Sequence, residues 1–139
     1  MSKGPEANFW NTLKKNLPSK CKAWRIENRV GTGLPDVYLI WDGVPFWLEL
    51  KITNSCGVRI TPTQVAWHTS HSHCGGVSFI LVKHQGTGVI YLFEGSQSRE
   101  LASEGLSCEP NLYMGKALGP MFEALRSCAL SVMTADRGS

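Results

Sequence analysis

Apolar residues recur along this chain with two different periods, and these periods predict the order of helices and strands. Over residues 5–17 they return every three or four positions, as on one face of a helix, whereas residues 36–41 and 44–53 form long apolar runs typical of buried strands. Applied to the whole chain, the pattern predicts helix 5–17, strand 22–30, a glycine-rich turn 31–34, strand 36–41, strand 44–53, helix 62–72, strand 76–83, strand 88–93 and a last helix near 115–133. Residues 94–115, rich in Ser, Glu, Gly and Pro, predict a loop or a short helix.

Helices on both sides of a central sheet define the α/β class, and the length of the chain indicates one domain over residues 1–134 with a disordered tail at 135–139. The strand at 76–83 is apolar enough to be covered on both faces, so we expect it to run parallel to strand 44–53 after a helical crossover. The last helix has an apolar stripe that we expect to pack on the sheet, with a dimer interface as the alternative. The stripe consists of Leu118, Met121, Phe122, Leu125, Ala129 and Val132.

Two charged residues interrupt the apolar strand at 44–53. Glu49 and Lys51 share one face of it because side chains alternate along a strand, and ionised groups in apolar surroundings are costly unless paired or metal-bound. The pair Asp42-Gly43 predicts a hairpin turn, and pairing about that turn places Asp36 beside Glu49. Two neighbouring carboxylates favour a hard divalent cation such as Mg²⁺, and the nearby lysine can orient or deprotonate a bound water.

The motif Gly33-Leu34-Pro35-Asp36, followed by Glu49-Leu50-Lys51 on the next strand, resembles the PD-(D/E)XK nuclease superfamily. The Gly-x-Pro-Asp lead-in, the short chain and a downstream Gln64 are similar to the VRR-NUC branch and the related cellular Holliday-junction resolvases. The resemblance covers roughly residues 6–93, most of the chain. It implies an αβββαβ core and a phage or bacterial protein that acts in the bacterial cytoplasm.

The resemblance also implies roles for individual residues. Asp36 and Glu49 are expected to hold Mg²⁺ or Mn²⁺, with the carbonyl of Leu50 as a further ligand and Glu6 of the first helix contributing directly or through water. The expected catalytic residues are Glu6, Asp36, Glu49, Lys51 and Gln64.

Glu6 and Gln64 also have simpler interpretations. Glu6 can be a first-turn carboxylate stabilised by the helix dipole. Thr61 can cap a helix that begins at Pro62, which places Gln64 in the first turn, either near the active site or merely solvated.

The formal net charge of +3 says little about partners, but the distribution of charge says more. Between residues 14 and 29 the basic side chains are Lys14, Lys15, Lys20, Lys22, Arg25 and Arg29. Only Glu27 opposes them, so this basic segment can neutralise DNA phosphates in a salt-dependent way. A merely solvated surface is the alternative.

Two further groups of residues suggest other chemistry. His68, His71, His73 and Cys74 include zinc-ligand types, but their spacing is not that of a zinc finger, so a helix end or phosphate contacts fit better. The five cysteines are dispersed and unpaired in spacing, which indicates reduced thiols. Core packing is the first expectation for the five tryptophans, with Trp47 the best candidate for base stacking because it shares the face of Glu49.

Together these features predict a Mg²⁺- or Mn²⁺-dependent DNA endonuclease. The branch of the family implies a four-way junction as substrate and a C2 homodimer that makes two matched cuts. The alternatives are a flap or single-strand nuclease with the same site, a DNA-binding protein on the same fold that no longer cleaves, and a small zinc-binding interaction protein. The sequence has no apolar stretch of eighteen residues and no signal-peptide pattern, so we expect a soluble cytoplasmic protein without a membrane partner.

Overall fold

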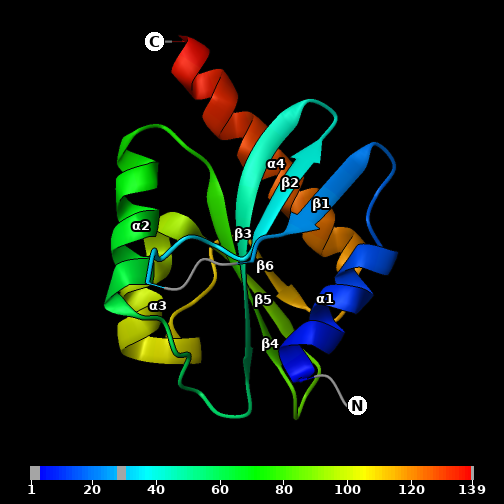
Figure 1. Cartoon of the computed structure of the whole chain (residues 1–139), viewed down its shortest axis with the longest axis vertical. Coiled ribbons are helices and arrows are strands. Elements are labelled where there is room, and N and C mark those ends of the chain that lie inside the picture. Colours follow the sequence, from blue (N-terminus) through cyan, green and yellow to red (C-terminus); the bar gives the residue numbers. More distant parts are fainter. Residues whose placement is uncertain (1–3, 28–30, 139) are drawn as a thin grey trace.

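The computed structural model describes residues 4–27 and 31–138, which form a six-stranded mixed sheet with helices on both faces (Figure 1). The helices are α1 (Pro5–Lys15), α2 (Pro62–His73), α3 (Ser98–Glu104) and α4 (Leu118–Gly138). The strands are β1 (Cys21–Arg25), β2 (Val37–Trp41), β3 (Val44–Thr53), β4 (Ser78–His84), β5 (Ile90–Glu94) and β6 (Tyr113–Gly115). Short 3-10 turns at Gly95–Gln97 and Gly105–Ser107 flank α3.

The strands lie in the sheet in their order along the chain, from β1 at one edge to β6 at the other. All neighbours are antiparallel except β3 and β4, which are parallel and joined by the crossover helix α2. The predicted αβββαβ core, the parallel β3–β4 pair and the α/β class are therefore confirmed.

The β2–β3 hairpin has the register that the sequence predicts. Asp42 and Gly43 have φ values of 50° and 84°, the left-handed backbone of a tight two-residue hairpin turn. Trp41 then pairs with Val44, and the ladder continues to Val37 opposite Leu48. The next positions in this register are residues 36 and 49, so the two carboxylate positions are adjacent.

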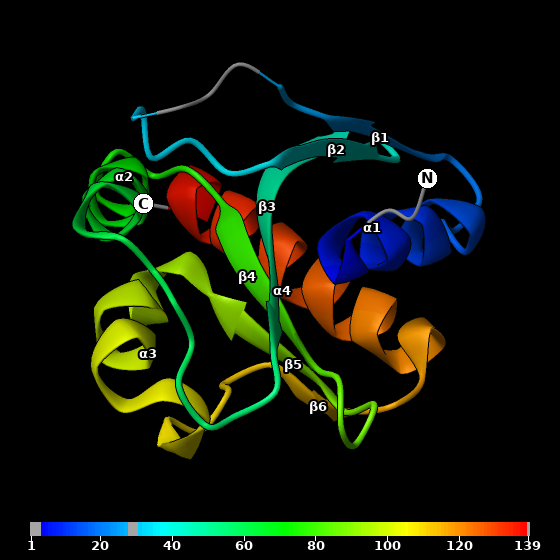
Figure 2. The same ribbon diagram turned by 60° about the horizontal axis from the view of Figure 1, so that its bottom comes forward.

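Each face of the sheet has its own core (Figure 2). Helices α1 and α4 cover one face, where Phe9 and Leu13 of α1 pack with Leu125 of α4 and with apolar residues of β2, β3 and β4. Helices α2 and α3 lie on the other face, where a smaller cluster contains Ile80, Leu101 and their neighbours. The apolar stripe of α4 packs against the sheet, as predicted.

Several element boundaries differ from the prediction. Strand β1 ends at Arg25 rather than at residue 30, α1 ends at Lys15, and the segment expected as a loop or short helix contains both α3 and the edge strand β6. Helix α4 continues to Gly138, into the stretch 135–139 that was expected to be a disordered tail. Residues 28–30, which include the predicted DNA-binding Arg29, lie outside the described residues. No helix within the described ranges has the length and apolarity needed to cross a membrane.

Candidate active site

Asp36 directly precedes β2, and a hydrogen bond to β3 fixes its side chain. Its side chain is fully buried, and its Oδ1 accepts a hydrogen bond of 2.8 Å from the backbone N–H of Leu50. Because β2 starts only at Val37, the Asp36 carboxylate takes the place that a strand backbone carbonyl would occupy beside Leu50. The carboxylate is therefore anchored to β3.

The same bond fixes the direction of the Leu50 carbonyl. In an antiparallel ladder the N–H and C=O of one residue point toward the same neighbouring strand. Since the Leu50 N–H points to Asp36, its carbonyl also faces the side of β3 beyond the end of β2. Two oxygen donors, one from a carboxylate and one from a backbone carbonyl, thus lie at this position.

Glu49 is the second buried carboxylate, with 1% of its surface exposed. It lies in β3 one residue before Leu50, on the face that also carries Lys51. Two carboxylates and a carbonyl form an all-oxygen donor set, which fits Mg²⁺ or Mn²⁺, since Mg²⁺ takes one or two protein carboxylates and keeps water or phosphate in its other positions. Among the described residues, no group of three or more His, Cys, Asp and Glu side chains is placed to hold a metal ion.

Lys51 is held by the first turn of α2. Its Nζ donates a 3.0 Å hydrogen bond to Oε1 of Gln64. The same Oε1 accepts from the backbone N–H of Thr61 at 3.0 Å, and the Thr61 hydroxyl accepts from the Gln64 N–H, so the pair forms a capping box. The helix cap therefore fixes the glutamine, and the glutamine fixes the lysine.

Gly33 brings the loop before Asp36 onto the same helix turn. It has φ of 75°, and a Cβ at this position would collide with the backbone carbonyl of Thr63. Only glycine combines this conformation with so close an approach. The glycine of the Gly-x-Pro-Asp motif thus joins the loop before Asp36 to the helix that carries Gln64.

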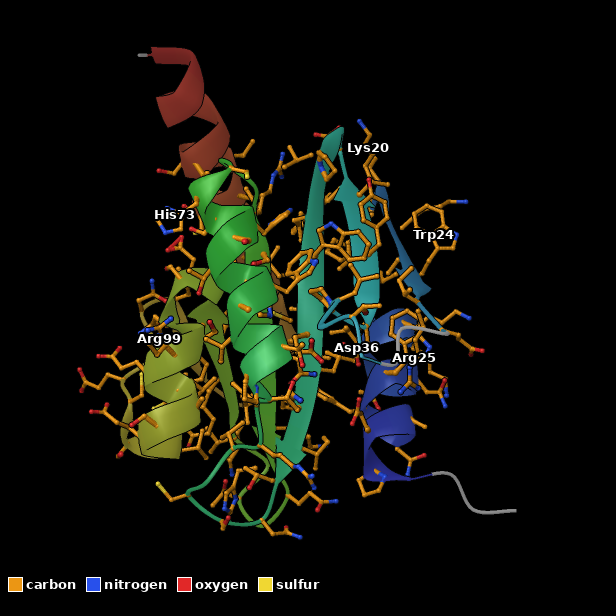
Figure 3. The ribbon with its side chains drawn as sticks, turned by 60° about the vertical axis from the view of Figure 1, so that its left-hand side comes forward. Lys20, Trp24, Arg25, Asp36, His73 and Arg99 are labelled. Carbon is orange, nitrogen blue, oxygen red and sulfur yellow. The ribbon has the colours of Figure 1, made fainter. Side chains whose placement is uncertain are left out.

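Glu6 lies near the site but is engaged elsewhere. Its Oε1 is 3.8 Å from the Arg25 guanidinium, and both side chains are partly exposed. Arg25 is itself next to the site, because the N–H of the following residue, Ile26, donates to the Asp36 carbonyl at 2.7 Å (Figure 3). The structure therefore places Glu6 beside Arg25 and not in a cluster of three carboxylates with Asp36 and Glu49.

The predicted basic segment is divided between two places. Lys22 and Arg25 lie in β1, and Lys20 directly precedes that strand. Arg25 is at the end of β1 beside Asp36, and Lys20 is at the opposite end (Figure 3). Lys14 and Lys15 are exposed in the last turn of α1, about 12–14 Å along the helix axis from Glu6. Of these residues, Arg25 adjoins Asp36, whereas Lys22 pairs with Ile40, four residues from Asp36, and the Lys20 carbonyl accepts from the N–H of Asp42 at the far end of the hairpin.

His68 is the buried residue of α2, one turn after Gln64. Its Nδ1 is 2.8 Å from the hydroxyl of Ser78 on β4. Burial, then the nearby charges of His71 and Lys51, lower the pKa of His68 to about 4, so the ring is neutral at pH 7. Sequence reasoning placed this residue in a possible zinc cluster or at the rim. The spacing of four residues from Gln64 is the signal that could have placed both on the inner face of α2.

The other members of the histidine cluster do not converge on one point. His71 stacks on the Trp67 ring with centroids 4.5 Å apart, and burial lowers its pKa. His73 and Cys74 are exposed at the C-terminal end of α2 (Figure 3). His73 and Cys74 thus lie at the helix end, as the sequence predicts, whereas His68 and His71 pack within the body of α2, which the sequence did not predict.

A search of solved structures finds a similar fold in Archaeoglobus fulgidus Hjc, described as a Holliday junction resolvase from an archaeal hyperthermophile. The two chains are 16% identical, the match covers 68% of this chain and 75% of that chain, and the TM-score is 0.52. The likeness shows that the two chains share a fold. Neither a family model nor a curated protein sequence matches the chain.

Within this fold, the structure brings together four of the five residues predicted as catalytic. Asp36 bonds to the backbone of β3 next to Glu49, and Lys51 bonds to Gln64. Glu6 lies near them, but its carboxylate faces Arg25 at 3.8 Å.

Proposed function

We propose that this chain is a metal-dependent DNA endonuclease that cleaves four-way junctions as a homodimer. The observation that carries the proposal is the pair of buried carboxylates, Asp36 and Glu49, beside a lysine that is fixed by a helix cap. Two adjacent buried carboxylates and the Leu50 carbonyl together offer a set of oxygen donors that suits a divalent cation. The fold supports the same chemistry.

Each residue has a separate task in this scheme. A divalent cation, when bound, would polarise a phosphoryl oxygen and lower the pKa of a coordinated water. Asp36, Glu49 and the Leu50 carbonyl would hold it. Lys51 orients or deprotonates the attacking water, or neutralises charge that develops on the phosphate, and Gln64 keeps its ammonium in place.

The substrate proposal needs symmetry. Resolving a four-way junction takes two matched cuts, and a C2 dimer relates two active sites by one axis. Contacts to phosphates would let the chain recognise the shape of the DNA, and Arg25 beside Asp36, with Lys22 and Lys20 farther along the same edge of the sheet, would supply them. A flap or single-strand nuclease with the same site is the alternative within this chemistry, and a binding protein that no longer cleaves is the alternative outside it.

The decisive test is a panel of labelled DNAs in Mg²⁺ or Mn²⁺: four-way junction, flap, splayed arm, duplex and single strand. We expect paired symmetric nicks in the junction, and a loss of roughly a hundredfold or more in rate for Asp36→Asn and for Glu49→Gln. Glu123→Gln, an exposed carboxylate change on α4, is the matched control and should leave the rate unchanged. Failure to cut any substrate, or full activity in both site variants, would remove the nuclease proposal.

Oligomeric state tests the resolvase version separately. Light scattering at micromolar concentration, with and without junction DNA, should give the mass of two chains. A monomer under both conditions that still cuts flaps or single strands would instead favour the alternative substrate.

A further inference from the structure

Aromatic side chains form a continuous row across the sheet face that carries Glu49. The row runs from Trp24 on β1 to Tyr38 on β2 and Trp47 on β3, which are cross-strand neighbours. The rings of Trp24 and Tyr38 stack at 6.1 Å between centroids, and those of Tyr38 and Trp47 meet at 5.1 Å with an angle of 60°. We call these three residues the aromatic row.

This row begins next to the two carboxylates. Tyr38 lies two residues after Asp36, and Trp47 lies two residues before Glu49. Residues two apart along a strand share a face. Two strand residues span about 7 Å. If the carboxylates hold the phosphate of one nucleotide, the neighbouring nucleotide of the strand would therefore lie beside these rings.

The row is accessible to a ligand. Helix α2 lies to one side of it and leaves β1 and β2 uncovered, and Trp24 projects from the edge strand (Figure 3). Trp24 is 49% exposed, a large value for a tryptophan in a strand. At the other end of the row, Tyr38 and Trp47 line a hollow of about 250 Å³ together with His71 and Gly76 of α2 and the turn after it.

The charges around the row favour nucleic acid over a second protein surface. Lys22 lies on the same face of β1 as Trp24, and Lys20 precedes it, so two cations flank the rings on one side. Arg25, the residue after Trp24, points to the opposite face of β1 and pairs with Glu6, so it is not one of these cations. In a symmetric interface between two copies these lysines would recur on both partners and repel one another, whereas phosphates would neutralise them.

We propose that the aromatic row binds an unpaired nucleobase of the DNA strand that is cut. This inference rests on the proposed nuclease function and deepens it, because it specifies that the substrate has an unstacked nucleotide next to the scissile phosphate. Branch points and flaps offer such a nucleotide, while a continuous duplex keeps its bases stacked. Aromatic rings accept any base because every base has a π-face, so the row adds affinity without sequence preference.

The test separates base contacts from phosphate contacts. In the Glu49→Gln background, without divalent cation, fluorescence anisotropy measures the affinity for a labelled oligo-dT and for an abasic oligonucleotide of equal length. We expect oligo-dT to bind more tightly by roughly five- to a hundredfold. Trp24→Ala should lose most of this difference while binding the abasic strand unchanged, and Trp24→Phe should retain most of it.

Met114→Ala is the control, because Met114 is 61% exposed on β6 at the opposite edge of the sheet. It should bind both strands as the parent does. Equal affinity of the parent for the two strands, or equal weakening of both by Trp24→Ala, would overturn the inference. A dimer that falls apart on Trp24→Ala, with base-dependent binding intact, would assign the row to a second copy instead. The binding assay needs no cleavage, so the two proposals can fail separately. If the wild type cuts DNA but binding does not depend on the base, only the role of the aromatic row is refuted. If binding depends on the base but the wild type cuts no DNA, only the nuclease function is refuted.

Discussion

The buried His68 predicts a specific dependence of stability on pH. In the folded chain its ring is completely buried, its Nδ1 contacts the Ser78 hydroxyl, and its pKa is lowered to about 4. In the unfolded chain the ring recovers its ordinary pKa of 6.5. Between about pH 4 and pH 6.5 the unfolded state therefore binds a proton that the folded state does not.

The sign and size of the effect follow from this difference. Stability rises with pH wherever the unfolded state binds more protons, so the free energy of unfolding falls as pH drops from about 6.5 toward 4. Linkage with these two pKa values gives a loss of roughly 2–3 kcal/mol between pH 7.5 and pH 4.5. That is a large share of the 5–15 kcal/mol typical of a folded domain.

The assay is urea unfolding followed by tryptophan fluorescence at pH 7.5, 6.5, 5.5 and 4.5. His68→Asn is the comparison, since its amide can still bond to Ser78 but does not titrate. Carboxylates and the other histidines titrate in both proteins, so the difference between the two pH profiles isolates residue 68. We expect the wild type to lose roughly 2–3 kcal/mol more than the variant over this range. Parallel profiles would refute the assignment of a neutral, buried His68.

Three further predictions concern the loop, the core and the thiols. Gly33→Ala should destabilise the protein by more than Gly31→Ala in thermal unfolding. Both glycines have positive φ, which costs an alanine roughly 1–2 kcal/mol, but only at position 33 would the added Cβ also collide with the backbone of α2. Equal losses would show that the contact is unimportant. Leu125→Ala should lower the free energy of unfolding by roughly 2–5 kcal/mol, because this side chain is fully buried against the sheet. Leu130→Ala on the same helix should lower it by under about 1 kcal/mol, because Leu130 is exposed. Similar losses for the two variants would mean that α4 packs differently. A thiol reagent at pH 7.5 should rapidly modify two cysteines in the folded protein and all five after unfolding. The other three thiols are protected because burial raises their pKa to about 11 or 12. Rapid modification of all five in the folded protein would contradict this. The exposed pair is Cys56 and Cys74, and the protected residues are Cys21, Cys108 and Cys128.

The hairpin that carries the carboxylates could be predicted from sequence because two independent signals agree there. The Asp42-Gly43 turn demands a left-handed backbone, and the apolar runs on either side fix which residues face the core. Once the turn is placed, the register is determined and Asp36 must lie beside Glu49. The start of α2 at Pro62 could also be predicted from the sequence, since Thr61, Pro62 and Gln64 are local signals within one turn.

Other features depend on contacts between distant segments, which no local pattern contains. The three-residue strand β6 exists because it pairs with β5, and its own sequence has no strand period. The ion pair between Glu6 and Arg25 joins a helix to a strand, so the sequence could place an acid on the inner side of α1 without revealing its partner. Likewise, Gly33 was read as part of a motif, while its physical role lies in its approach to Thr63, thirty residues later in the chain.

Helix α2 shows why functional residues are hard to find by periodicity. A helix that covers a sheet normally presents an apolar stripe, but the inner face of α2 must meet the charged Lys51 of β3 and so carries Gln64 and His68 instead. The apolar pattern is therefore weak where the site is built, and the same residues that obscure the helix face are those that position the lysine. If Gln64 were replaced by leucine, the stripe would become more regular while Lys51 would lose its hydrogen-bond acceptor and the helix its capping box. The departure from the pattern is thus itself a signal of the site.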